Sequence, residues 1–407
     1  MTEPSAAEDH AAPARSRIVA LDALRGFAVL GILMMNIQTF AMIVDAYGDP
    51  LAHRDFSGAN RLVWIVSHLF FDLKFITIFS VLFGAGVAMT TGSGRDDATA
   101  RHVRRMAILF AIGVLHAYLF WYGDILMAYA VWGMACLLFL DRRAGALIAG
   151  GVALVGVTAF LFWAQYDGWV QSSYFSPSLW RPSAEDIARA EALYRAPWPE
   201  RIMRSAAEIT ATQTSSGIFF GPRVLGCMLI GIGLYRLGFL TGAWSTLRYA
   251  LCAVFGLAIG LGLSALTTWG LMAGEFLPRA MRWAAPLDHM AALVVAFGYA
   301  SIVMLAARPQ ALRWLVSPLA AVGRMALTNY IAQSVIAAFL FYGPPGLGWF
   351  GTVERTGQFT IVLAVWAAQL IWSPLWLAVF RFGPLEWVWR SLTYGQAQPM
   401  LRRPASA

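Results

Sequence analysis

Long apolar runs recur along almost the whole 407-residue chain, and few charged residues interrupt them. A helix needs about 20 apolar residues to cross the hydrocarbon core of a bilayer. Inside that core every backbone N–H and C=O must be paired within the protein, so each run is expected to be a helix. Hydrophobic residues make up 59% of the chain and charged residues only 13%, too little charge to cover soluble domains. The sequence therefore predicts an all-α, polytopic integral membrane protein.

The predicted spans number ten and lie near residues 20–44, 62–89, 106–122, 124–140, 145–164, 217–236, 249–272, 287–306, 325–342 and 358–380. Their orientation follows from arginine, which supplies every basic residue except Lys74. With the N-terminus inside, the arginine-bearing short loops and the C-terminal tail face the cytoplasm, as the positive-inside rule requires. These arginines are Arg95, Arg101, Arg104, Arg105, Arg142, Arg143, Arg236, Arg248, Arg308, Arg313, Arg381, Arg390, Arg402 and Arg403. We expect a multi-pass protein of the cytoplasmic (inner) membrane with both termini in the cytoplasm.

Arg279 and Arg282 fall on the outer side in this topology and run against the rule. The net charge of +8 comes largely from the cytoplasmic loops. No nucleic-acid partner is therefore inferred from it.

The predicted membrane domain covers residues 17–395. Residues 1–16 form a polar, Ala-rich cytoplasmic tail that we expect to be disordered, and 396–407 form a second cytoplasmic tail. Residues 165–216 are the one long polar stretch between spans and are predicted to be extracytoplasmic. Acidic and basic residues alternate at helical spacing over 184–209, which favours one or two amphipathic helices on the membrane surface. A solvated linker is the alternative.

Ionisable and amide side chains inside the spans are candidates for function, because such groups are costly in a bilayer. The first span holds Asp22 and Arg25, whose spacing of three suits an ion pair on one helix face. Asn36 lies about 16 Å deeper at the usual helical rise. A structural ion pair and an amide contact between helices are the plainer alternatives.

The second span contains His68, Asp72 and Lys74. Asp72 and Lys74 are two residues apart, so they point to different faces of a helix. Each is therefore expected to reach a partner on another helix. Gly84 and Gly86, further along the span, allow close helix packing.

The third span and the turn after it hold His116 and Asp124. His116 follows Arg105 by eleven residues, and about 1.5 Å per residue places it near the bilayer midplane. With the carboxylates of Asp72 and Asp124 in reach, an imidazole there suits proton or acyl handling. A histidine that only packs between helices is the alternative.

The ninth span opens on Arg324 and continues with Thr328 and Asn329, whose hydrogen-bonding groups interrupt an apolar helix. Contacts between helices explain these groups slightly better than ligand binding does. The three cysteines lie in apolar runs without paired spacing, so neither disulfides nor a metal site is predicted. Walker, HExxH and GxSxG motifs are absent from the sequence.

Five blocks of the chain together resemble the YeiB-type membrane proteins, known as domain-of-unknown-function family 418. They are residues 21–28 with Gly31 and Asn36, 74–84, 113–129, 323–330 and 383–387, within a resemblance that spans about 17–395. This resemblance implies membership of a wider group of transmembrane acyltransferases, among them the heparan-α-glucosaminide N-acetyltransferases. That group resembles enzymes that move an acyl unit from cytosolic acyl-CoA to an acceptor across the membrane. For the YeiB branch the inference is an analogy of fold and superfamily.

On this basis we predict a membrane acyltransferase that moves an acyl group, such as acetyl, to an extracytoplasmic envelope glycan or lipid. His116 would act as general base or carry the acyl group, oriented by Asp124 or Asp72. His53 and His68 are rival histidines.

Acyl-CoA is expected as a co-substrate, with no bound cofactor. Its phosphates would meet arginines at the cytoplasmic mouth, which bind phosphate through charge-assisted hydrogen bonds: Arg25, Arg104, Arg105 and Arg324. Membrane lipid and an envelope glycan or glycolipid are the expected partners, and the sequence is compatible with a homo-oligomer.

Two other classes of function stay open. A small-solute transporter also suits intramembrane charges, although the sequence has no paired Gly/Pro-broken helices. A non-catalytic scaffold would instead disperse its polar groups onto separate helix contacts, those of Asp22, Lys74, His116 and Asn329.

Overall fold

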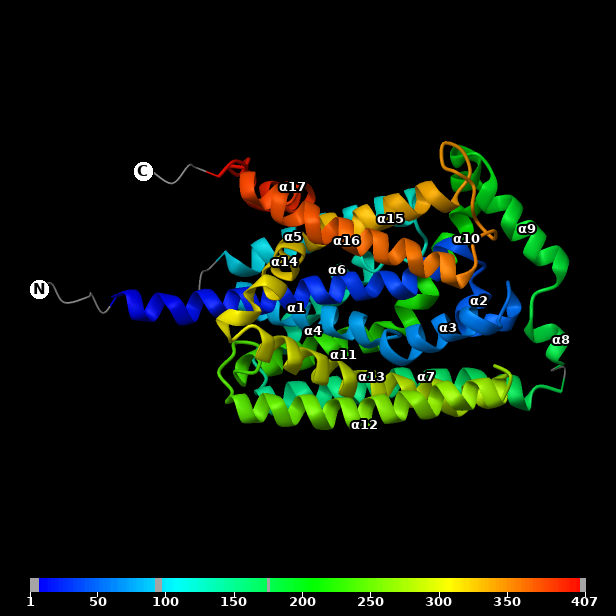
Figure 1. The fold of residues 1–407 in the computed structure, drawn as a ribbon, viewed down its shortest axis with the longest axis horizontal. Helices are drawn as coiled ribbons and strands as arrows, with labels where there is room; N and C mark the ends of the chain where they lie inside the picture. Colours follow the sequence, from blue (N-terminus) through cyan, green and yellow to red (C-terminus); the bar gives the residue numbers. More distant parts are fainter. Residues whose placement is uncertain (1–6, 92–96, 174–175, 403–407) are drawn as a thin grey trace, which may run out of the picture.

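The structure is a computed structural model and describes residues 7–91, 97–173 and 176–402. Its helices form an elongated bundle and run mostly along the long axis (Figure 1). The start of α1 (Ala7–Ala41) and the last helix, α17 (Pro384–Tyr394), lie at the same end of the bundle. The short helices α8 (Pro177–Trp180) and α9 (Ala184–Arg195) lie at the opposite end. The described residues contain helices and no strand beyond an isolated bridge, which confirms the all-α class.

The other helices follow in chain order: α2 (Asp45–Gly48), α3 (Gly58–Phe70), α4 (Lys74–Thr91), α5 (Ala98–Leu119), α6 (Leu126–Ala135), α7 (Ala144–Gln171), α10 (Trp198–Phe219), α11 (Gly221–Arg236), α12 (Thr246–Ala273), α13 (Pro278–Ala306), α14 (Arg313–Arg324), α15 (Ala326–Phe341) and α16 (Arg355–Val379). Three short 3-10 turns complete the order: Pro50–Ala52, Cys136–Phe139 and Gln310–Leu312.

Seven helical segments among the described residues are long and apolar enough to cross a membrane: Val19–Ala41, Gly58–Thr91, Ala98–Leu119, Ala144–Gln171, Thr246–Ala273, Pro278–Ala306 and Arg355–Val379. The pair α10 and α11, bent by 52°, makes an eighth if it is one span. All eight overlap predicted spans, so a multi-pass membrane protein is confirmed. The count of ten is not, because the helices at the other two predicted positions, Leu126–Phe139 and Ala326–Phe341, are shorter.

The span predicted at 62–89 is not one continuous helix. α3 ends at Phe70 and α4 begins at Lys74. Between them Leu73 has a φ of +58°, in the left-handed region that a residue other than glycine adopts only at a cost. The apolar pattern runs on through this break, so periodicity alone does not reveal it.

Of the N-terminal tail that is expected to be disordered, residues 1–6 lie outside the described residues. α1 begins at Ala7, and an Ala-rich sequence has a high helix propensity. At the loops, Arg95 and Arg403 of the predicted cytoplasmic set lie outside the described residues. Which end of the bundle faces the cytoplasm stays a prediction.

The polar stretch 165–216 is mostly helical. α7 continues to Gln171, and α9 and α10 then fill most of the remainder. Ser183 caps α9 through a capping box with Asp186, and Pro197 separates α9 from α10. The position of these helices relative to a membrane surface stays a prediction.

Glycine decides how closely α4 and α11 approach. A Cβ on Gly84 would lie 2.0 Å from the Met228 carbonyl oxygen, and one on Gly231 would lie 1.9 Å from the Val81 carbonyl oxygen. Each helix thus lays a glycine against the other's backbone, which is the small-residue packing typical of membrane helices. Gly86 has open space at its Cβ position, so of the two glycines predicted to pack, Gly84 makes the contact.

Candidate functional site

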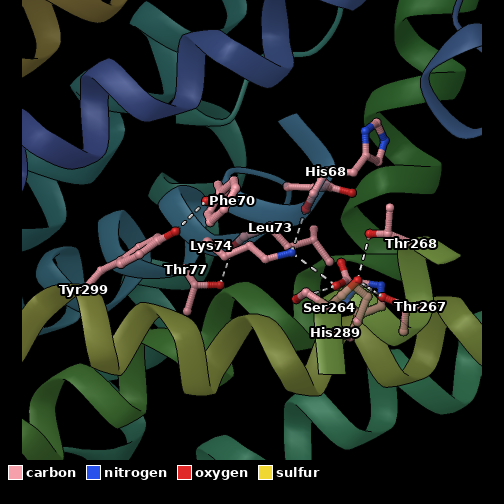
Figure 2. A network of polar contacts seen from close by, with 12 residues as sticks. His68, Phe70, Leu73, Lys74, Thr77, Ser264, Thr267, Thr268, His289 and Tyr299 are labelled. Atoms are coloured by element: carbon pink, nitrogen blue, oxygen red, sulfur yellow. Dashed lines mark hydrogen bonds and ion pairs between the residues drawn. The ribbon is translucent and has the colours of Figure 1, made fainter. Parts of the chain in front are cut away.

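The interruption between α3 and α4 frees backbone carbonyls, and side chains satisfy them (Figure 2). Lys74 Nζ donates to the His68 carbonyl at 3.0 Å. The Phe70 carbonyl accepts a hydrogen bond from the Tyr299 hydroxyl at 3.1 Å. Unpaired carbonyls are costly in an apolar interior, so these contacts stabilise the break. The break is thus a supported element of the fold.

The Lys74 side chain is fully buried and joins α4 to α13. Its Nζ lies 3.1 Å from Asp288 Oδ1, which also accepts from the Ser264 hydroxyl of α12 at 3.2 Å. Asp72 turns to a different neighbour, because its Oδ1 accepts from the Tyr47 hydroxyl at 2.7 Å. The expectation that Asp72 and Lys74 reach separate partners is confirmed.

A cavity of about 810 Å³ lies beside this break. Its ionisable lining residues are Asp72, Asp124, Asp288, Arg223, His68 and His289, with the Tyr47 phenol beside them. Apolar and aromatic side chains make up much of the remaining wall, among them Ile32, Met35, Phe75, Trp132 and Phe162. The cavity therefore combines an apolar volume with a concentrated polar edge.

Arg223 supplies the cavity's guanidinium. It lies in the first turn of α11, just after the bend from α10, and is 4% exposed. Its Nη2 donates to the Thr77 hydroxyl at 2.6 Å. Its Nη1 donates to the His289 carbonyl at 2.8 Å and to His289 Nδ1 at 3.2 Å. All of these partners are uncharged acceptors, so no carboxylate neutralises this buried cation within 4 Å in the described chain.

Sequence analysis missed both Arg223 and Asp288. Each lies inside a predicted span, at 217–236 and 287–306 respectively. An ionisable residue within a span is itself a signal of function, so the signal was present in the sequence. What the sequence could not supply is that both side chains meet Asp72 at one cavity.

His116 and Asp124 form a buried pair whose Nδ1 and Oδ1 lie 2.7 Å apart, with side chains 1% and 0% exposed. Asp124 Oδ2 also accepts from the Met127 N–H at 2.8 Å, so it fixes the start of α6. His116 lies in the last turn of α5, and its buried Nε2 has no hydrogen-bond partner among the described residues. Asp124 borders the cavity and His116 does not, so the pair is closed off behind the wall.

Gly113 makes the His116–Asp124 contact sterically feasible. A Cβ at this position would lie 2.6 Å from the Met127 backbone nitrogen and 3.0 Å from Asp124 Oδ2. Any larger residue would push α5 away from the turn before α6. This packing gives the motif over residues 113–129 a physical reason.

Three of the four arginines expected to hold acyl-CoA have partners within the protein. Arg25 is paired with Asp22 at 2.7 Å. Arg105 lies with its Cζ 4.3 Å from the centre of the Trp389 ring. Arg104 Nη1 reaches a backbone carbonyl of α17 at 3.4 Å. These contacts are sufficient to explain the three residues as structural.

Arg324 has a different setting, in a separate pocket of about 570 Å³ with Arg381, Phe382 and Arg402. A backbone bridge from Phe380 to the returning chain sets Arg402 near Arg381. Burial and the charge of Arg402 lower the pKa of Arg324. Within the described chain none of these three arginines forms an ion pair, so the pocket suits a polyanion.

Thr328 and Asn329 make contacts between helices. The Thr328 hydroxyl donates to Glu386 at 2.5 Å, and Glu386 also accepts N–H groups at the start of α15. Asn329 is fully buried and donates to the Ser373 hydroxyl of α16 at 3.0 Å. Asn36, by contrast, lines the cavity.

Of the rival histidines, His68 lines the cavity and stacks on Trp64 with ring centres 4.0 Å apart. His53 lies in the connection before α3, with its Nε2 3.1 Å from Glu191 Oε1 of α9. Glu191 therefore ties the α9 helix to this connection. His68 is the better placed of the two for a role in the cavity.

The polar residues thus divide into two groups. Asp22, Lys74, His116 and Asn329 lie on separate helix contacts, as a scaffold would require. A second set converges on the cavity: Asp72, Asp288, Arg223 and His289. This convergence is what a substrate site requires.

Comparison with known sequences gives the same family. Residues 234–396 match a family described as "Protein of unknown function (DUF418)". The chain is 35% identical over 404 residues to "Uncharacterized protein YeiB" of Escherichia coli (strain K12), covering 95% of this chain and 99% of that protein. It is 30% identical over 416 residues to "Uncharacterized protein YxaH" of Bacillus subtilis (strain 168), covering 95% and 96%.

Proposed function

Since this chain belongs to the YeiB-type membrane proteins of the DUF418 family, we propose, from its own cavity and charges, that it is a membrane acyltransferase. The donor is acyl-CoA on the cytoplasmic side. The acceptor is an amine or hydroxyl of an envelope glycan or lipid. The observation that carries the proposal is the 810 Å³ cavity, which pairs an apolar wall with a polar edge that includes Asp72.

Asp72 is the proton acceptor in this proposal. Of the three residues predicted to be catalytic, Asp72 has an accessible side chain in the cavity wall, whereas His116 and Asp124 are covered. Asp72 would take a proton from the acceptor as its nitrogen or oxygen attacks the thioester carbonyl. The new C–N or C–O bond forms, the C–S bond breaks, and the thiolate of CoA leaves and is protonated. Catalysis by His116 would first require the wall at Asp124 to open.

In this proposal the donor phosphates bind in the pocket of Arg324, Arg381 and Arg402, three guanidiniums that form no ion pair with another described residue. Arg25 lies nearer the N-terminal end of α1 than Asn36, which lines the cavity. The two residues are about 16 Å apart along the helix. An extended thioester arm would therefore run along α1 from the arginine pocket toward the cavity. We place the arginine-rich end in the cytoplasm.

Cysteine labelling tests that topology. The background is Cys252→Ser, because the other two cysteines are buried. In this background, Asp97→Cys should resist a membrane-impermeant thiol reagent in intact cells. Glu185→Cys on α9 should react, since its side chain is 84% exposed. The opposite pattern would reverse the topology and move the donor pocket to the wrong side of the membrane.

The activity is tested by mass spectrometry of envelope lipids and glycans from cells with and without the protein. Loss of an acyl-bearing species in the deletion strain, restored by the parent protein and not by Asp72→Asn, is the expected result. Asp97→Asn, an exposed change of the same kind, should restore it. An unchanged envelope in the deletion strain would count against acyl transfer. Restoration by Asp72→Asn but not His116→Gln would move the base to the buried pair.

A specific observation also favours a small-solute transporter. The α3–α4 break and the α10–α11 bend both border the cavity, although the sequence indicated no paired broken helices. Interrupted helices that meet at a central site are typical of secondary transporters. Purified protein in vesicles separates the two functions, because an acyltransferase forms an acylated product from acyl-CoA, whereas a transporter accumulates an unmodified solute.

A further inference from the structure

We propose that the cavity selects a zwitterionic amphiphile, with its ammonium group at Asp72 and its phosphate or carboxylate group at Arg223. This names the chemical class of the acceptor. Its role as acceptor rests on the proposed acyltransferase function, but its binding does not.

Arg223 provides the positive subsite. It is 4% exposed, lines the cavity and contacts only uncharged acceptors of Thr77 and His289. Because a guanidinium can only donate, His289 Nδ1 must be the acceptor, and this histidine is neutral. A buried cation in a membrane protein is expected to pair with an anion. A ligand phosphate or carboxylate at the cavity edge would supply that anion.

Asp72 provides the negative subsite. Its Oδ1 accepts a hydrogen bond from the Tyr47 phenol at 2.7 Å, and within the described residues no basic group lies within ion-pair distance of it. Lys74, its neighbour in sequence, is already engaged by Asp288 at 3.1 Å. A ligand ammonium group would therefore find at Asp72 a carboxyl group without an ion-pair partner among the described residues.

The other charges at the cavity already have partners. Asp288 is balanced by Lys74, and Asp124 is bound by His116 with its side chain fully covered. Among the described residues, Asp72 and Arg223 are thus the acidic and the basic side chain of the wall that form no ion pair. A purely anionic ligand would leave Asp72 unpaired, and a purely cationic one would leave Arg223 unpaired.

The two subsites are neighbours through the first turn of α4. Arg223 Nη2 donates to the Thr77 hydroxyl, and that hydroxyl donates to the Leu73 carbonyl at 2.6 Å. Leu73 follows Asp72 directly in the chain. The break that lifts Asp72 out of the helix therefore also brings it next to the arginine's anchor.

The remainder of the cavity suits an apolar tail. Phe110 of α5 and Val131 of α6 line it and are nevertheless 39% and 51% exposed. These helices thus leave an apolar opening at the side of the bundle. In a membrane that side would face lipid, from which an amphiphile can enter with its tail still in apolar surroundings.

The test uses the full-length protein in maltoside micelles and single-chain amphiphiles of one chain length. Lysophosphatidylethanolamine, lysophosphatidylglycerol, an alkyltrimethylammonium and an alkyl maltoside compete with a fluorescent maltoside for binding. The zwitterion should bind most tightly. Arg223→Gln should weaken binding of the zwitterion and the anion about tenfold and spare the cation, since each charge-assisted contact contributes on that order. Asp72→Asn should weaken the zwitterion and the cation and spare the anion.

Two further variants keep the test decisive. Arg223→Lys retains the charge and should keep the preference for anionic groups even if Arg223→Gln does not fold. Arg204→Gln, on the exposed face of α10, makes the same loss of charge away from the cavity and should change no preference. Equal affinities for the four amphiphiles, or preferences that stay the same in the Arg223 and Asp72 variants, would overturn the inference.

The outcome is separable from that of the proposed function. Preferences that follow the two charges without any acyl transfer would reject the acyltransferase and leave the subsites in place. If the protein transfers acyl groups but its amphiphile preferences are the same in the parent and in the Arg223 and Asp72 variants, the two subsites are rejected and the acyltransferase stands.

Discussion

The ion pair of Lys74 and Asp288 allows the fold's dependence on the α3–α4 break to be measured. Lys74→Met keeps the length of the side chain but removes the charge, so Asp288 loses its cation and the His68 carbonyl loses its donor. Breaking one partner of a buried pair costs roughly 3–5 kcal/mol, because it leaves a buried charge without compensation. Asp288 keeps the Ser264 hydroxyl and is 17% exposed, so we expect the lower part of that range.

The pair energy itself comes from a double-mutant cycle. Asp288→Asn removes the same attraction from the other side, so the double variant should cost less than the sum of the single ones. The expected coupling is about 2 kcal/mol, within the range for contacting residues. The double variant Lys74→Met, Asp288→Asn still loses the donor to the His68 carbonyl. We expect this unpaired carbonyl to lower the free energy of unfolding by about 1–3 kcal/mol.

The assay is the free energy of unfolding in mixed micelles titrated with a denaturing detergent, followed by tryptophan fluorescence. The Arg204–Glu200 pair on α10 serves as the matched control, since both side chains are about half exposed. Its coupling should be below about 1 kcal/mol. If Lys74→Met costs no more than Arg204→Met, or if the Lys74 and Asp288 changes simply add, the buried pair does not support the break.

Three further changes test other parts of the fold. Gly113→Ala should lower the free energy of unfolding by about 1–3 kcal/mol, because its Cβ would lie 2.6 Å from the backbone of α6. Gly86→Ala has nothing within 4 Å of its Cβ and should cost nothing in the same unfolding titration. Glu386→Ala removes the cap of α15 and should cost about 1–2 kcal/mol; an unchanged midpoint would show that the cap is dispensable. Burial lowers the pKa of His53 below 6.5, so its contribution to stability is full above about pH 6.5 and declines as the pH falls toward the lowered value. Thermal unfolding of His53→Gln should therefore be less sensitive to acid than that of the parent, and an identical pH profile would refute this.

Several features of the site were visible in the sequence because they depend on composition and local spacing. Asp72, Lys74, His116 and Asp124 are ionisable residues inside or next to apolar runs, and the sequence therefore indicated them as candidates for a functional or structural role. Asp72 and Lys74 have separate partners, as predicted, but the helical spacing is not the reason, because Asp72 lies in the break before α4 begins at Lys74. The partners themselves, Tyr47 and Asp288, required the tertiary structure, because they are distant in the chain.

The sequence alone determined the class of the molecule. Apolar runs long enough to cross a bilayer, with little charge, can be satisfied only by helices that pair their own backbone groups, so the all-α membrane fold followed from local composition. Tertiary structure decided which polar groups meet. The break at Leu73 and the bend before Arg223 leave the apolar pattern unchanged, yet they turn Asp72 and Arg223 toward one cavity and leave His116 sealed against Asp124. Such a meeting depends on how helices far apart in sequence pack, and periodicity within one helix carries no information about it.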